Sequence, residues 1–334
     1  MHGPRGARAG LARPSSSPGA TNGERRFLVI AQAIHCRVVL LAAAALVLAS
    51  GPSLAQAPAT PGGLPAQWEE LTAPDFARAV ERSAGTAVIP IGVVEKHGPH
   101  LPLGTDLLDA REVALRAAKK EYSVVFPPYY FSQIFEAKHQ PGTLAYSARL
   151  VWDVLQETVD EIARNGVKKI ILVNGHGGNN SFLPFFCQSL LARRRDYVVY
   201  LFQPSGDPEA DPRVKALRQT PVDMHAGEVE TSTMLAHRPD ITHPERAREQ
   251  SGADQARLEG LKDAYTAIWW YARFPNHYAG DGSPASPELG NIVLDFQADQ
   301  LAAMIRAVKA DTKALELQQR FFDEAEKPLQ TPQR

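Results

Sequence analysis

Three short segments of the sequence concentrate side chains that bind metals and transfer protons. The first runs from Glu95 to Asp106 and has the spacing Glu-x-His-x8-Asp in a loop rich in Gly and Pro. Glu95 and His97 project to one side of an extended chain, and the turns that follow can return Asp106 to them. Carboxylate oxygens and imidazole nitrogens suit Zn²⁺, Mn²⁺ or Fe²⁺, and the two oxygens of Asp106 can bridge two ions. We therefore predict a metal site here, with a helix N-cap for Asp106 and structural roles for His97 and His100 as the alternatives.

The second segment, from Asn174 to Asn180, surrounds a single imidazole, His176, with glycines directly after a predicted strand. A Gly-rich turn between a strand and a helix can also bind phosphate through its backbone N–H groups. The spacing matches neither G-x-x-x-x-G-K-S/T nor G-x-G-x-x-G, however, which argues against nucleotide binding. Glycines let the backbone approach closely and aim His176 at a target, and a metal ion is the simplest such target.

The third segment, residues 223–232, contains His225, Glu228 and Glu230. If a helix begins near His225, then His225 and Glu228 lie on one face and Glu230 points elsewhere. Glu228 would then act as a metal ligand or base, and His225 as a proton donor. The alternative is a charged first helical turn that complements the helix dipole. An aromatic loop over residues 269–290 fits a pocket wall, packed core or a subunit contact equally well.

Alternating strands and helices are expected to position these segments. The alternation is typical of a single α/β domain with three layers, α/β/α, around a mostly parallel sheet. Ligands bind at the carboxyl ends of such strands, after Val94 and Val173, where the first two segments lie. Pro90 indicates that its strand is an edge strand or contains a bulge. Periodicity predicts strands over 86–94, 122–126, 168–173 and 197–202, and helices over 106–120, 149–165, 181–195 and 297–324.

Residues 1–57 are predicted to be a secretory signal peptide with an extended basic region. Arginines precede an apolar run at 38–49, and Ala55-Gln56-Ala57 provides a small-x-small cleavage site. The apolar run spans about 18 Å as a helix, short of the roughly 30 Å hydrocarbon core, so we expect no stable membrane anchor after cleavage. The general secretory route is favoured over twin-arginine export at Arg25-Arg26. The mature protein is therefore expected in the periplasm or outside the cell.

The composition is that of a globular protein, with 334 residues of which 44% are hydrophobic. The net charge of −1 gives no electrostatic reason to expect a nucleic-acid partner. Beyond residue 57 only Cys187 remains, so no internal disulfide is expected. Residues 58–67 form a predicted Pro/Gly-rich tether with nothing to bury, and residues 68–325 form the domain.

Taken in order, the three segments resemble the motifs of the creatininase family of metal-dependent amidohydrolases. The resemblance covers residues 71–290. It implies a compact α/β/α fold, commonly assembled as a homo-oligomer (a hexamer), that holds two divalent ions, Zn²⁺ with Zn²⁺, Mn²⁺ or Fe²⁺. By motif, Glu95 and His176 would hold one ion and His97 the other. Asp106 would bridge both.

Two departures from the family pattern concern the pocket. Creatininase has a glutamate two residues after the histidine of the second segment, where this chain has Gly178. We expect Glu228 to replace that ligand, and the departure argues against creatinine itself as the substrate. The Ser and His that usually precede Phe-Pro-Gly-Thr in the family correspond to Ser132 and His139, but here Gln140 opens that motif. The pocket wall is therefore expected to differ.

The expected function is metal-dependent amidohydrolysis of a small-molecule substrate. A cyclic amide or formamide-type C–N bond would be cut by a metal-bridged hydroxide. His225 would protonate the leaving nitrogen, and Glu228 would hold the second ion or orient the water. Other branches of the family include a deformylase and a peptidase that trims a redox-peptide precursor. The alternatives are therefore a family peptidase and, because Gly178 has no carboxylate, a non-catalytic periplasmic binding protein on the same scaffold.

Overall fold

The computed structural model describes residues 63–203, 211–261 and 263–333. The predicted signal peptide, 1–57, and the first part of the predicted tether lie outside the described residues. The strands are β1 (Thr86–Ile91), β2 (Val124–Val125), β3 (Lys169–Asn174), β4 (Val198–Phe202), β5 (Asp223–His225) and β6 (Ala279–Gly280). The α-helices are α1 (Ala73–Arg82), α2 (Thr105–Lys120), α3 (Ala148–Arg164), α4 (Asn179–Ser189), α5 (Pro212–Leu217), α6 (Glu228–His237), α7 (Trp269–Arg273), α8 (Pro287–Ala310) and α9 (Lys313–Ala325). Short 3-10 helices are η1 (Trp68–Glu70), η2 (Leu190–Ala192), η4 (Pro239–Ile241), η5 (Pro244–Glu249), η6 (Glu259–Leu261) and η7 (Pro328–Gln330).

The main sheet has the order β2-β1-β3-β4, and all of its neighbouring strands are parallel. β1 and β3 pair along their whole length, from Thr86 opposite Lys169 to Ile91 opposite Asn174. The two strands therefore end at the same level, and the loops that follow them leave the same edge of the sheet. β5 and β6 form a separate antiparallel pair.

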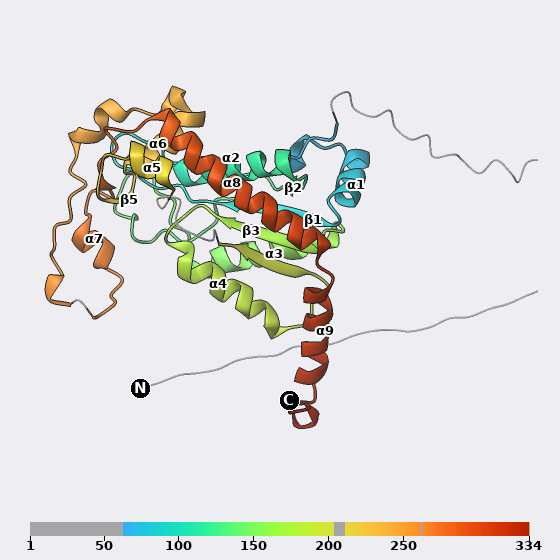
Figure 1. Cartoon of the computed structure of the whole chain (residues 1–334). Coiled ribbons are helices and arrows are strands. Elements are labelled where there is room, and N and C mark those ends of the chain that lie inside the picture. The colour runs from blue at the N-terminus through green and yellow to red at the C-terminus, as the bar shows by residue number, and fades with distance from the viewer. Residues whose placement is uncertain (1–62, 204–210, 262, 334) are drawn as a thin grey trace, which may run out of the picture. The chain divides into compact units, whose positions relative to one another are not determined.

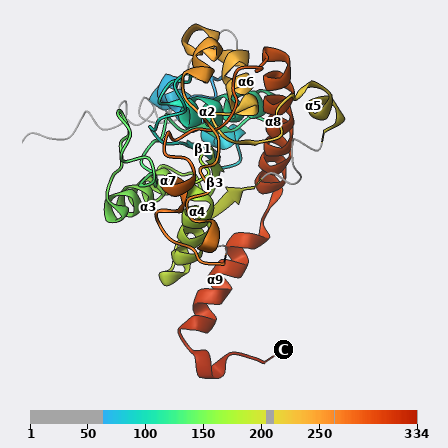
Figure 2. The same cartoon turned by 90° about the vertical axis from the view of Figure 1, so that its left-hand side faces the viewer.

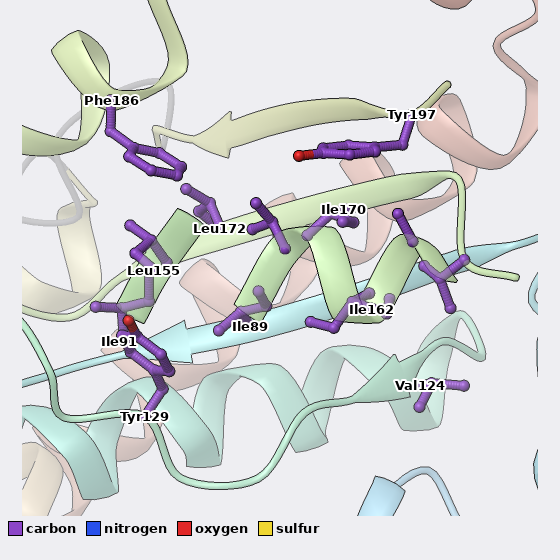
Figure 3. Packing of buried hydrophobic residues seen from close by; sticks show 14 of the residues in the cluster. Ile89, Ile91, Val124, Tyr129, Leu155, Ile162, Ile170, Leu172, Phe186 and Tyr197 are labelled. Atoms are coloured by element: carbon purple, nitrogen blue, oxygen red, sulfur yellow. The ribbon is translucent and has the colours of Figure 1, made fainter. Parts of the chain in front are cut away.

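Helices cover both faces of the main sheet, as Figures 1 and 2 show. On one face, side chains of α3 and α4 such as Leu155 and Phe186 pack against Ile89 and Leu172 (Figure 3). On the other face, α2 and α8 pack against the strand side chains that point the opposite way, which are Val88, Val125, Ile171 and Val173. Burial of each large apolar side chain contributes about 1.5–3 kcal/mol before entropy is counted. The predicted three-layer α/β/α fold with a mostly parallel sheet is confirmed.

Local sequence signals place the helix ends close to their predicted positions. Ser147 caps α3 by accepting a hydrogen bond from the backbone N–H of Leu150, and Gly166 follows that helix with a φ of 94°. Ser286 caps α8 in the same way through Leu289. The C-terminal pattern predicted over 297–324 is resolved into α8 and α9, and α8 begins ten residues earlier, at Pro287.

Pro90 lies in a central strand that pairs with β3 without a register shift, which corrects the prediction of an edge strand or a bulge. β1 pairs with β2 on one side and β3 on the other, but β2 pairs only with Ala87 and Val88. The missing N–H of Pro90 faces the β2 side, between Val88 and Gly92, where β2 has already ended. The ladder therefore loses no hydrogen bond at Pro90, because that position has no strand partner on that side.

The last residues of the predicted tether bury apolar side chains, which corrects the prediction that the tether has nothing to bury. Leu64 and Ala66 pack against the two faces of the sheet, and the carbonyl of Ala66 accepts a hydrogen bond from Val125. The backbone carbonyl of Pro65 accepts a hydrogen bond from the hydroxyl of Tyr122 at 3.0 Å.

Across the described ranges, no helix combines the length and apolarity required to cross a bilayer.

Candidate metal centre

The loops after β1 and β3 bring the first two predicted segments together. Glu95 and His97 follow β1, His176 follows β3, and Asp106 lies in the first turn of α2. All four side chains are buried. Gly175 permits the close approach of β3 to α2, because a Cβ there would lie 2.7 Å from the carbonyl oxygen of Asp106. The carboxyl edge of the sheet therefore collects these polar groups in one place, as the parallel topology requires.

Glu95, Asp106 and His176 form the first triad of donor atoms. His176 Nδ1 lies 2.9 Å from Glu95 Oε1 and 2.8 Å from Asp106 Oδ2. Yet in the described part of the chain neither oxygen has a hydrogen bond of acceptable geometry, although both are buried. Buried polar atoms are normally satisfied, so two unsatisfied carboxylate oxygens beside His176 Nδ1 indicate a site for a cation.

His97, Asp106 and Glu230 form the second triad. His97 Nε2 lies 2.9 Å from Asp106 Oδ1 and 3.5 Å from Glu230 Oε1. In each triad the three donor atoms lie within 4.8 Å of one another. Asp106 thus presents Oδ2 to the first triad and Oδ1 to the second, which is the arrangement of a carboxylate that bridges two ions.

Histidines and carboxylates stabilise one another's charges in the metal-free centre. Burial opposes protonation of His97, but Glu230 and Asp106 outweigh it and raise the His97 pKa well above its usual value. Against the same effect of burial, Glu95 and Asp106 raise the pKa of His176. Burial would raise the pKa of Glu95, but His176 and His225 hold that pKa well below its usual value. The protons on the two ligand histidines therefore occupy places that metal ions would take.

His225 lies beside both triads. Its Nε2 donates a hydrogen bond to the carbonyl of Lys96 at 2.9 Å, and its ring lies 4.3 Å from that of His97. Nδ1 lies 4.0 Å from Glu230 Oε2, and Nε2 lies 4.0 Å from Glu95 Oε2. The structure thus places the predicted proton donor next to the cluster of predicted metal ligands.

The structure does not bring Glu228, predicted as ligand or base, into either triad. Its buried carboxylate accepts hydrogen bonds from the backbone N–H groups of Gln219 and Thr220 at 2.7–2.9 Å. Glu230 lies in the second triad instead, which corrects the prediction that its side chain points elsewhere. The reason is the helix phase: α6 begins at Glu228 and not near His225. Glu230 is then the third helical residue, and its carboxylate accepts a hydrogen bond from the backbone N–H of Ala226, just before the N-cap Gly227.

His100, the other imidazole of the first segment, has a structural role. Its Nε2 forms a hydrogen bond with the hydroxyl of Thr231 at 2.8 Å. Burial lowers the pKa of His100 to about 4, so the ring is neutral at physiological pH. It belongs to neither triad.

His277 contacts the centre and was missed as a site residue by sequence reasoning. The indole N–H of Trp270 donates a hydrogen bond to His277 Nδ1 at 2.9 Å. Nδ1 is therefore the acceptor, and Nε2 carries the proton that it donates to Glu95 Oε2. This bond leaves Glu95 Oε1 facing the first triad. His277 has a φ of 51°, a left-handed conformation that is rare outside glycine and is found at sites where the surrounding structure fixes the backbone.

We expect His277→Ala to weaken metal binding about 10- to 100-fold, because outer residues that orient a ligand contribute that much to affinity. Trp270→Phe should have a smaller effect, since it removes only the bond that fixes the His277 tautomer. Competition with a chromophoric chelator measures both dissociation constants. His243→Ala is a control, because this half-exposed histidine pairs with Glu245 outside both triads. An unchanged dissociation constant in His277→Ala would show that the Glu95 contact does not support metal binding.

A cavity of about 370 Å³ is lined by one residue of each triad. Its walls include His176 from the first triad and Glu230 from the second, together with Gly177, Phe202 and Asp109. The side chain of Glu230 is 27% exposed, whereas those of His97 and Asp106 are essentially inaccessible. A small molecule in this cavity therefore meets the edge of the centre where Glu230 lies.

The chain is similar in sequence and fold to proteins of known activity. The creatininase family model, described as creatinine amidohydrolase, matches residues 69–305. Creatinine amidohydrolase from Pseudomonas putida is 27% identical over 194 residues, which cover 53% of this chain and 74% of that enzyme. The mycofactocin precursor peptide peptidase of Mycolicibacterium smegmatis is 32% identical over 159 residues, which cover 46% of this chain and 58% of the peptidase.

Solved structures of creatininases have the same fold as this chain. A crystal structure of creatinine amidohydrolase aligns with a TM-score of 0.62 at 25% identity, covering 74% of this chain and 99% of that one. Related creatininase structures include a manganese form and a Zn–Zn form. From the family match, which spans most of the described domain, and from the shared fold, it follows that the chain belongs to the creatininase family.

Proposed function

We propose that this protein is a dinuclear metal-dependent hydrolase of a C–N bond. The observation that carries the proposal is Asp106, whose two oxygens face two separate triads of buried donor atoms. Glu95, Asp106 and His176 would hold one ion, and His97, Asp106 and Glu230 the other. This set of oxygen and nitrogen donors suits Zn²⁺, Mn²⁺ and Fe²⁺. The manganese and Zn–Zn forms of creatininase support the same choice of ions.

The residues around the triads would donate a proton, position a ligand and limit the approach of the substrate. Bound divalent ions supply a hydroxide near neutral pH and positive charge for a developing oxyanion. His225 is the proposed donor of a proton to the leaving nitrogen, because its imidazole lies beside both triads. His277 holds Glu95 in place through its Nε2–H. Glu230 reaches the cavity, so it also limits how closely a substrate approaches the second triad.

We propose a small cyclic amide or formamide as the substrate class. The cavity of about 370 Å³ beside His176 and Glu230 lies at the small end of ligand pockets, which favours a compact substrate. A peptidase is the second candidate, supported by the 32% identity to the mycofactocin precursor peptide peptidase. A larger cavity of about 1150 Å³ between α4 and residues 265–271 also supports it, because Phe182, Phe185 and Tyr271 line it.

The alternative of a non-catalytic binding protein is less well supported than the hydrolase. That alternative rested on Gly178, where creatininase has a glutamate. Glu230 supplies a carboxylate to the second triad from α6, so three donors face each of the two proposed ions. Export and assembly into a homo-oligomer stay predictions, since the first depends on residues 1–57 and the second on further copies of the chain.

Metal analysis together with a substrate screen tests the proposal. Protein purified without chelator should contain about two equivalents of divalent metal, and a chelator should remove its hydrolytic activity. The screen covers creatinine, other lactams, formamides and short peptides, with released amine or acid as the signal. A protein that binds no divalent metal at neutral pH would refute the dinuclear hydrolase.

Metal affinity should fall as the pH is lowered. The pKa values of His97 and His176 are raised above the ordinary 6.5 by the facing carboxylates, which outweigh burial, so both rings hold protons that metal must displace. The apparent dissociation constant should therefore rise by up to about tenfold per pH unit for each proton displaced. The dependence should continue above pH 6.5 and flatten only beyond the raised pKa values. Chelator competition between about pH 6 and 9 measures it, and a flat profile would contradict the displacement of these protons.

A further inference from the structure

His176 has a buried nitrogen without a partner on the side that faces away from the first triad. Its Nδ1 faces Glu95 and Asp106, and the residue is 7% exposed. Nε2 is buried, and across residues 63–203, 211–261 and 263–333 it has no hydrogen-bond partner. A histidine that gives Nδ1 to a metal ion keeps its proton on Nε2, and a buried N–H group requires an acceptor. The acceptor for the Nε2 proton of His176 is therefore still to be identified.

Glu136 and Gln133 border the space next to that nitrogen. A Cβ at Gly178 would lie 2.4 Å from His176 Nε2, 2.7 Å from Glu136 Oε1 and 2.8 Å from Gln133 Nε2. These three atoms thus surround the small volume that a side chain at position 178 would fill. Because residue 178 is a glycine, a carboxylate from another segment of the chain lies next to the ring of His176.

The carboxylate of Glu136 is held in this position by an oriented amide. The backbone N–H of Phe135 donates to Gln133 Oε1 at 2.7 Å, which leaves Gln133 Nε2 as the donor end of the amide. Gln133 Nε2 then donates to Glu136 Oε2 at 3.0 Å. Glu136 Oε1 has only a longer contact with the same nitrogen, at 3.3 Å, and can accept a further hydrogen bond.

We propose that Glu136 accepts the Nε2 proton of His176 and so positions this ligand for the metal. The inference rests on the proposed function, because it assigns an outer contact of the same centre. Glu136 is a positioning residue and not a ligand, since it lies on the Nε2 side of the ring while the donor atoms of the first triad gather at Nδ1. A carboxylate in this place fixes the tautomer of the ring and makes its other nitrogen a stronger donor to the metal.

The test compares the zinc affinity of the wild type, Glu136→Ala, Glu136→Gln and Lys138→Ala. We expect Glu136→Ala to weaken one of the two zinc equivalents about 10- to 100-fold. Glu136→Gln should recover part of the loss, because its amide oxygen accepts the same bond without the charge. Lys138→Ala is the matched control from the same loop and the same 1150 Å³ cavity, and should bind zinc like the wild type. A Glu136→Ala dissociation constant equal to that of the wild type would overturn the inference.

A spectroscopic readout separates positioning from a general loss of folding. In zinc-loaded protein labelled with ¹⁵N-histidine, the Nε2 proton of His176 should exchange slowly and resonate downfield. Its signal should move in Glu136→Gln, which has the same shape and remains informative even if Glu136→Ala does not fold. An unmoved signal in Glu136→Gln contradicts the contact. Two zinc equivalents in the wild type with no effect of Glu136 would overturn this inference alone, whereas a wild type without zinc would overturn the proposed function with it.

Discussion

Replacement of Asp106 by asparagine is expected to remove both metal ions and to lower hydrolysis by about a thousandfold or more. Asp106 is the only residue that contributes an oxygen to both triads. Each ion stabilises the transition state by several kcal/mol, and each 1.4 kcal/mol corresponds to a factor of ten in rate. Asparagine has the same shape, so it keeps the start of α2 while it removes the charge and one of the two ligand oxygens.

Metal content and activity should be measured together on Asp106→Asn. The matched control is Asp109→Asn, three residues further along α2. Asp109 is also a half-buried carboxylate, but its oxygens accept hydrogen bonds from His237 at 2.6 Å and from Thr233 at 2.5 Å. It should retain two equivalents of metal. Full metal content and full activity in Asp106→Asn would refute the bridging role.

The fold and the meeting of the first two segments follow from patterns that a sequence records directly. The alternation of strand and helix indicates a parallel sheet, and the carboxyl ends of parallel strands share one edge. These two facts place the loop of His97 beside the loop of His176, where the structure has them. Neither the parallel sheet nor the shared edge depends on where a helix or strand begins to within one or two residues. Both predictions are therefore confirmed even though some boundaries differ.

The choice between Glu228 and Glu230 depends on such a boundary, and here the sequence-based reasoning was wrong about where Glu230 points. A shift in the helix start changes which side chains face the centre. No apolar stripe fixes the phase of α6, because Thr231, Ser232, Thr233 and Met234 are all buried in succession. Ala226, with a φ of 55°, also turns the chain just before the helix in a way that its residue type does not indicate.

His277 lay beyond sequence reasoning for a different reason. It is 182 residues from Glu95 in the chain, and no spacing rule joins the two. The contact exists because β6 pairs with β5 and because α7 places Trp270 against the histidine ring. The sequence shows only that His277 lies in a loop rich in aromatic residues. Such a loop is equally typical of a pocket wall, packed core or a subunit contact.

The two neighbouring glutamates of α6 should give opposite results when each is replaced by glutamine. Glu230→Gln is expected to retain one equivalent of metal and to lose activity about 100- to 1000-fold, because the second triad loses its terminal carboxylate. Its amide oxygen can still accept the N–H of Ala226, so the start of the helix should persist. The remaining ion should be the one held by Glu95, Asp106 and His176.

Glu228→Gln should keep both ions and instead destabilise the fold. Its buried carboxylate accepts the backbone N–H groups of Gln219 and Thr220, and hydrogen bonds to a charged group contribute about 1.5–3 kcal/mol. Thermal unfolding should therefore begin a few degrees lower, with metal stoichiometry unchanged. Metal analysis and melting curves on this pair separate a ligand from a structural acceptor two residues away. If Glu228→Gln lost an ion while Glu230→Gln kept both, the helix phase seen in the structure would have to be abandoned in favour of a helix that begins near His225.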